Sequence, residues 1–95
     1  MKIDQDTLLY GSFAEKAGSK GCELFNTCFE YYQLNAIYKS FSVSSIGPAV
    51  DAARTLHIKG FAITMPYKMD VLPYLDECSE EVETIGAANT IVNND

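Results

Sequence analysis

Along this chain, short apolar segments rich in β-branched and aromatic residues alternate with segments whose apolar residues recur at helical spacing. The short segments are typical of strands. Gly11 and Ser12 should close the first strand, and Pro66 should end the third, because proline cannot donate a hydrogen bond within a sheet. The strands are therefore expected at residues 7–10, 36–43, 61–65 and 89–92.

The first helix is expected to begin at Ser19, a residue type that suits the N-cap position. Its apolar residues recur every three or four positions and include two cysteines. We expect both cysteines in the hydrophobic core rather than in a reactive role. The apolar stripe consists of Cys22, Phe25, Cys28, Phe29 and Tyr32.

The second helix should follow Ser44 and Ser45, either of which can cap it. Pro48 is tolerated because it falls in the first turn. Gly60 then supplies the stop signal for this helix. The stripe that we expect to be buried comprises Ile46, Val50, Ala53 and Leu56.

Two short helices are expected after Pro66. The first should reach Leu75, although Pro73 breaks or shortens it. The second should begin at Ser79, because acidic residues favour the positive end of the helix dipole, and end at Gly86. The acidic residues here are more typical of a solvated helix face than of a metal site, since no histidine or cysteine has ligand spacing among them. They are Asp76, Glu80, Glu81 and Glu83.

The alternation of strands and helices predicts an α/β fold, a small layered domain with a mostly parallel mixed sheet flanked by helices. A chain of 95 residues is one domain at most. The sequence ends on Asn93-Asn94-Asp95, residue types that open hairpins. An ending of this kind predicts that the returning strand is missing, so we interpret the sequence as part of a longer protein.

Composition narrows the class of protein. Seven basic and thirteen acidic residues give a net charge of −6, and the basic residues are scattered, which argues against a nucleic-acid surface. Three cysteines without a C-x-x-C pair favour a reducing compartment. The start lacks a signal-peptide pattern and no segment has the length of a membrane span, so a cytoplasmic protein is expected. The sequence contains neither a dinucleotide-binding fingerprint nor a P-loop.

Candidate chemistry lies where the third expected strand ends. Lys68 follows Pro66, and ligands of open α/β sheets bind in the crevice beyond the carboxyl ends of the strands. A lysine there can transfer a proton or hold an anionic substrate, although the pattern alone favours an exposed, solvated lysine. Thr64 either points into this crevice or is an ordinary strand residue. Ser19 either helps a helix N-terminus to bind a carboxylate or is only an N-cap.

Three segments together resemble the shikimate dehydrogenase family. Residues 60–68, GFAITMPYK, are similar to its pattern G-x-N-V-T-x-P-x-K. Residues 85–90, IGAANT, resemble I-G-A-V-N-T, and residues 19–26, SKGCELFN, resemble S-K-S-P-x-x-H-N. The segments occur in the family's order and span nearly the whole chain.

The resemblance implies a function for residues 1–95 as the substrate-binding domain of an oxidoreductase. The family reduces 3-dehydroshikimate to shikimate with NADPH on the route to chorismate and the aromatic amino acids. Lys68 matches its catalytic lysine, Ser19 matches a carboxylate-binding serine, and Thr64 and Asn89 match further substrate-binding residues. NADP would be bound by a separate Rossmann domain that this chain lacks. The aspartate that works with the lysine would lie beyond Asp95, so the chain alone should be inactive.

The sequence departs from the family pattern where hydrogen-bonding residues are expected. Gly21 replaces the second carboxylate-binding serine, Ala62 replaces an asparagine, and Phe25 replaces a histidine. The loop of residues 12–18 also differs. Lost hydrogen-bonding groups change substrate discrimination. A quinate-type dehydrogenase, a non-catalytic homologue that binds a small carboxylic acid as a sensor or regulator, and an interaction or dimerisation module are therefore alternatives.

Overall fold

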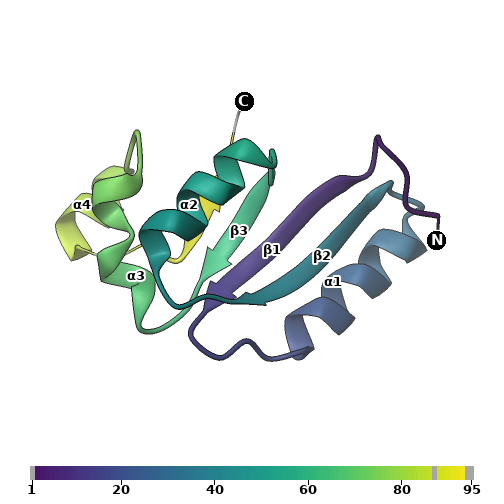
Figure 1. Cartoon of the computed structure of the whole chain (residues 1–95), viewed down its shortest axis with the longest axis horizontal. Helices are drawn as coiled ribbons and strands as arrows, with labels where there is room; N and C mark the ends of the chain where they lie inside the picture. The colour runs from purple at the N-terminus through teal and green to yellow at the C-terminus, as the bar shows by residue number, and fades with distance from the viewer. Residues whose placement is uncertain (1, 87, 94–95) are drawn as a thin grey trace.

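The computed structural model describes residues 2–86 and 88–93, and it confirms a small α/β domain built on a mixed sheet (Figure 1). The four strands lie in the order β2-β1-β3-β4. Strand β1 is parallel to β2 and β3, whereas β4 is antiparallel to β3. The strands are β1 Leu8–Ala14, β2 Ala36–Ser42, β3 Gly60–Ile63 and β4 Thr90–Val92. The helices are α1 Lys20–Tyr31, α2 Ile46–Thr55, α3 Tyr67–Asp70, the 3-10 helix η1 Leu72–Tyr74 and α4 Glu80–Ile85.

The two long helices cover opposite faces of the sheet. The register pairs even-numbered residues with even-numbered residues in all four strands, so these side chains share one face. The even-numbered Tyr38 stacks on Phe25 of α1, with ring centroids 4.6 Å apart. The odd-numbered Phe61 and Ile63 belong instead to the core that includes Val50 and Ala53 of α2. The even-numbered face is therefore the α1 face and the odd-numbered face the α2 face.

The first strand is longer than predicted, because Gly11 does not end it. A Cβ atom at Gly11 would lie only 2.5 Å from the carbonyl oxygen of Lys39 and 2.9 Å from the ring of Phe41. The glycine permits close packing of β1 against β2, and the strand continues to Ala14.

Helix α2 ends earlier than predicted, because Gly60 is not its stop signal. The helix finishes at Thr55, and His57 takes the left-handed conformation with φ of 56°. Gly60 instead begins β3, where it pairs with Tyr10. Leu56, expected in the buried stripe, is consequently 63% exposed. The other expected members of the stripe are buried, namely Ile46, Val50 and Ala53.

Helix α1 has the predicted position, but it packs more loosely than expected. None of its residues is fully buried. Cys28, expected in the core, is exposed, and Cys22 is half-buried with its Sγ atom 3.1 Å from Oγ of Ser40. The helix packs mainly on β2, and it reaches β1 through Phe29, whose ring centroid lies 5.6 Å from that of Tyr10.

The segment after β3 confirms the predicted short helices. Helix α3 and η1 lie on either side of Val71, which is fully buried. The hydroxyl of Ser79 accepts a hydrogen bond of 3.2 Å from the amide of Val82, and Gly86 ends α4 with φ of 79°. Asp76, Glu80 and Glu81 are exposed as expected, and the side chain of Glu83 lies outside the description.

The predicted hairpin at Asn93-Asn94-Asp95 falls largely outside the described residues. Asn93 is described, and its amide donates to the carbonyl oxygen of Lys59 over 2.9 Å. Within residues 2–86 and 88–93, no helix combines the length and apolar character that crossing a bilayer requires.

Candidate functional site

The three parallel strands end at one edge of the sheet, and backbone hydrogen bonds hold together the segments that leave them. The amide of Val43, after β2, donates to the carbonyl oxygen of Ala14 over 2.8 Å. The amide of Thr64, after β3, donates to the carbonyl oxygen of Phe13 over 3.1 Å, and its hydroxyl lies 3.4 Å from the same oxygen. Thr64 therefore lies at the carboxyl edge of the sheet, directly beyond β3.

Lys68 follows Thr64 on α3, in a turn fixed at several points. The amide of Tyr67 donates to the carbonyl oxygen of Thr64 over 3.0 Å. The hydroxyl of Tyr67, a residue only 7% exposed, donates to the carbonyl oxygen of Val43 over 2.7 Å. Lys68 itself is half-buried, and its carbonyl oxygen accepts from the amide of Ala88 over 2.8 Å. The lysine is therefore not the fully solvated residue that the bare pattern favoured.

Asn89 belongs to the same assembly through its backbone. Its carbonyl oxygen accepts from the amide of Ile63, the last residue of β3, over 2.9 Å. Its side chain is exposed, and Oδ1 lies 3.3 Å from the hydroxyl of Thr90. Together with the bond from Ala88 to Lys68, this contact brings Thr64, Lys68 and Asn89 to one place at the end of β3.

Ser19 occupies the predicted N-cap position of α1, but its side chain makes no capping hydrogen bond. The preceding loop is tied to the end of β2, where the hydroxyl of Ser42 accepts from the amide of Ala17 over 2.9 Å. The start of α1 therefore lies at the carboxyl end of β2. Among the described residues, no hydrogen bond joins Ser19 to the other three candidates.

Two residues with structural roles near the candidates were not singled out from the sequence. Tyr67 anchors the turn that carries Lys68. Asn26 anchors α1, because its side chain donates to the carbonyl oxygen of Tyr38 and accepts from the amide of Tyr38, each over 2.8 Å. Asn26 falls in one of the motif segments, so its position offered a signal. Tyr67 also lies in a motif segment, but at a position that the pattern leaves unspecified, and its partner is 24 residues away.

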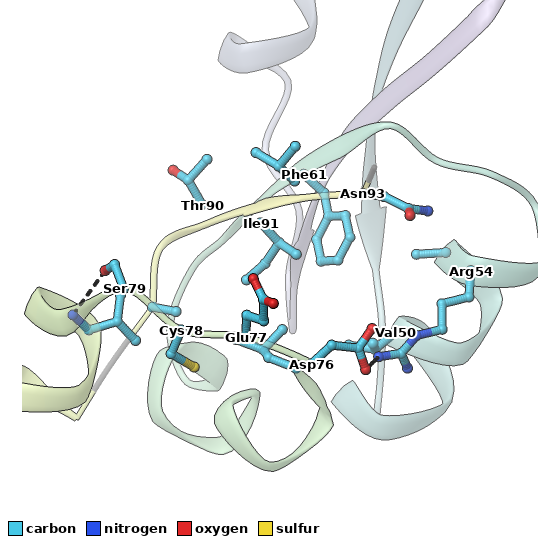
Figure 2. A pocket seen from close by; sticks show the side chains of 15 residues that line it. Val50, Arg54, Phe61, Asp76, Glu77, Cys78, Ser79, Thr90, Ile91 and Asn93 are labelled. Carbon is cyan, nitrogen blue, oxygen red and sulfur yellow. Dashed lines mark hydrogen bonds and ion pairs between the residues drawn. The ribbon is translucent and has the colours of Figure 1, made fainter. Parts of the chain in front are cut away.

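The larger cavity lies on the α2 face, and it is lined by Ala88 and Thr90, the two neighbours of Asn89, but by none of the candidate residues themselves. It has a volume of about 620 Å³ and is bounded by α2, β4 and the segment that joins η1 to α4 (Figure 2). Arg54 reaches Oδ1 of Asp76 over 3.1 Å and the carbonyl oxygen of Tyr74 over 2.7 Å. Ser19, Thr64, Lys68 and Asn89 are not among the residues that line it. Of its charged side chains, the exposed Arg54 and Asp76 are paired with each other, and Glu77 is exposed.

A second cavity, of about 550 Å³, lies on the α1 face. Its lining is mainly aromatic and includes Tyr10, Phe25, Phe29 and Tyr38. The interaction hypothesis requires an exposed apolar surface, whereas here Phe25 is exposed and Tyr10, Phe29 and Tyr38 are half-buried. Nothing in the described part of the chain gives this surface a partner.

Comparison with known proteins assigns a family. The sequence profile of the family described as "Shikimate dehydrogenase substrate binding domain" matches residues 14–91. The shikimate dehydrogenase (NADP(+)) of Pyrococcus abyssi is 43% identical over 70 residues, which cover 74% of this chain and 26% of that protein. A shikimate dehydrogenase-like protein of Haemophilus influenzae is 36% identical over 92 residues, which cover 97% and 34%.

A solved structure agrees with the sequence comparison. The shikimate 5-dehydrogenase of Listeria monocytogenes, in complex with shikimate and NAD, superposes with a TM-score of 0.92 at 30% identity. That match covers 100% of this chain and 34% of the other. The chain thus spans about a quarter to a third of the length of the curated relatives that it matches.

Proposed function

Because this chain belongs to the family of shikimate dehydrogenase substrate-binding domains, we propose that it is the substrate-binding part of an NADP-dependent oxidoreductase acting on shikimate and 3-dehydroshikimate. In this proposal Lys68 is the general acid and base, and Ser19, Thr64 and Asn89 hold the substrate. The observation that carries it is the backbone network at the end of β3, which unites Thr64, Lys68 and Asn89.

The proposed chemistry of Lys68 is proton transfer at the reacting oxygen. In the reducing direction its ammonium group would donate a proton to the substrate carbonyl oxygen, while NADPH, bound by the part of the protein outside this chain, would supply the hydride to the carbonyl carbon, so that the carbonyl becomes an alcohol. In the reverse direction the neutral amine would accept that proton. A side chain of this kind must be positioned within hydrogen-bond reach of the reacting oxygen. The bonds made by Tyr67 and by the carbonyl oxygen of Lys68 support such positioning.

The cofactor does not fit the described residues. A dinucleotide site of the Rossmann type needs a glycine-rich turn between a strand and a helix, where the pyrophosphate meets the helix N-terminus. The turns that follow β1, β2 and β3 in the described ranges carry no such glycine pattern. NADP would therefore be bound by a part of the protein outside this chain, and we expect the chain alone to be inactive.

A non-catalytic homologue that binds a small carboxylic acid is the second candidate, with a quinate-type dehydrogenase as a variant of the first. The replacements Gly21, Ala62 and Phe25 favour both, because each removes a polar side chain from the family pattern. Loss of such groups weakens discrimination between polyhydroxy acids by up to several powers of ten. The presence of Lys68 at the matching position favours the dehydrogenase.

The test is reduction of NADP⁺ by the complete protein in the presence of shikimate, followed by absorbance, with quinate measured in parallel. Turnover of either acid supports the dehydrogenase proposal and identifies the preferred substrate. Lys68→Ala should lower turnover at least about a hundredfold, whereas Lys39→Ala, a change at an exposed lysine of β2, should not. A folded protein that binds NADP but oxidises neither acid would favour the non-catalytic binder.

A further inference from the structure

The hydroxyl of Tyr38 lies beside the open first turn of α1. Gly21 leaves this turn without a side chain, and Tyr38 of β2 lies next to the gap. A Cβ atom at Gly21 would be 3.4 Å from Cε1 of Tyr38 and 3.6 Å from its hydroxyl oxygen. The phenol oxygen is thus within the reach of a small side chain at position 21, two residues after Ser19.

Tyr38 is held in this position by two residues of α1. The side chain of Asn26 makes two hydrogen bonds of 2.8 Å with its backbone. The ring of Phe25 stacks on the Tyr38 ring, with centroids 4.6 Å apart and an interplanar angle of 20°. Two of the departures from the family pattern, Gly21 and Phe25, therefore meet at one tyrosine.

The hydroxyls of Tyr38 and of Ser19, which precedes Gly21 by two residues, are both available to a ligand. Among the hydrogen bonds formed by residues 2–86 and 88–93, the Tyr38 bonds involve only its backbone. The Ser19 side chain does not cap its own helix. A half-buried hydroxyl without a protein partner can donate to a bound anion at little cost in displaced interactions.

We propose that Tyr38 is a substrate-binding residue whose hydroxyl donates a hydrogen bond to the substrate carboxylate beside Ser19. This assignment rests on the proposed function, because it concerns the acid that the same site would bind. The phenol hydroxyl supplies from β2 the donor that position 21 of α1 lacks. Phe25 stacks on the Tyr38 ring and Asn26 binds its backbone. The hydroxyl therefore has fewer accessible positions than the hydroxyl of a freely rotating side chain.

The test is Tyr38→Phe in the complete protein, which removes one oxygen atom and retains the stacked ring. We expect the KM for shikimate to rise about tenfold or more, as for loss of a hydrogen bond to a charged group. The kcat should change far less, because the contact is made equally in the ground state and the transition state. Methyl shikimate, which lacks the carboxylate, should show no such change in KM. Tyr32→Phe, at an exposed tyrosine just after α1, is the matched control.

A second substitution, at Gly21, tests whether the lost binding can be restored. The distance from Gly21 to the Tyr38 ring is an ordinary van der Waals contact, so a serine fits at position 21. Gly21→Ser in the Tyr38→Phe background should return most of the lost affinity for shikimate.

The outcomes separate this inference from the proposed function. If Lys68→Ala abolishes turnover while Tyr38→Phe leaves the KM for shikimate unchanged, the proposed function stands and the role of Tyr38 is wrong. An equal rise in KM for shikimate and its methyl ester also overturns the role, because altered packing then explains the effect. A complete protein that neither binds nor oxidises shikimate contradicts the proposed function and the inference with it.

Discussion

The two faces of the sheet are built in different ways. On the α2 face, Ile63 and Val71 are 1% and 0% exposed, and they belong to one continuous apolar core. On the α1 face, the strands present the half-buried Ser12, Ser40 and Ala62 beside two half-buried aromatic residues, Tyr10 and Tyr38. No residue of α1 is fully buried. One face is closed by apolar packing, and the other is held by hydrogen bonds and stacked rings.

This difference separates the tasks of stability and binding. Burial of apolar side chains provides most of the driving force for folding, and here it is concentrated on the α2 face. That core fixes the ends of β1 and β3, from which the turn with Thr64 and Lys68 departs. The open α1 face keeps polar groups and the start of α1 accessible, as the proposed binding of a small acid requires.

The largest effect is expected from a cavity in the closed face. Ile63→Ala should lower the free energy of unfolding by about 3–4 kcal/mol, because the side chain is 1% exposed and the space left behind cannot refill fully. Leu24→Ala on α1, at a residue 61% exposed, should change it by less than about 0.5 kcal/mol. Urea denaturation of both variants measures the difference. Similar losses would show that the two faces contribute equally.

A smaller effect is expected from crowding between β1 and β2. Gly11→Ala should lower the free energy of unfolding by about 2 kcal/mol, since the added Cβ atom would lie 2.5 Å from the carbonyl oxygen of Lys39. Gly18→Ala is the control, because a Cβ atom there meets nothing within 4 Å. The measurement is the midpoint of thermal unfolding of each variant. Equal midpoints would contradict the close packing of β1 against β2.

Signals that are local in sequence predicted the fold well. The alternation of patterns gave the strands and helices, and Ser79 and Gly86 marked the limits of α4 because both capping groups act on neighbouring residues. Two of the errors involved glycines whose roles depend on distant partners. Gly11 allows Lys39 and Phe41 of β2 to lie close to β1, and Gly60 pairs with Tyr10. Neither contact can be predicted from the local sequence pattern.

The candidate site was predictable in part for the same reason. Thr64, Lys68 and Asn89 belong to motif segments, and the structure brings these three residues together at the end of β3. Their roles stay predictions. The contacts of Tyr38 and Tyr67 could not be read from the sequence, because each contacts a residue more than ten positions away on another element.

The α1 face should respond to loss of hydrogen bonds. Asn26→Ala removes the two bonds that join α1 to the backbone of Tyr38, and we expect the free energy of unfolding to fall by about 1.5 kcal/mol. Thr27→Ala, at the exposed neighbour, should have almost no effect. Hydrogen exchange at the Tyr38 amide should also accelerate in the Asn26 variant alone. Unchanged exchange would mean that packing, not these bonds, holds α1 on the sheet.

The smallest effect is expected at Cys28, which the apolar stripe of α1 had suggested for the core. Its side chain is exposed, so Cys28→Ser should alter the free energy of unfolding by less than about 0.5 kcal/mol. Cys22→Ser provides the comparison, because that half-buried thiol lies 3.1 Å from the hydroxyl of Ser40. In the native protein a thiol reagent should label Cys28 well before Cys22, since access limits the reaction at the second site. Labelling of Cys22 first, or at the same rate, would show that α1 is rotated about its axis so that Cys28 faces the sheet. The α1 face would then be more closely packed than the contrast between the two faces assumes.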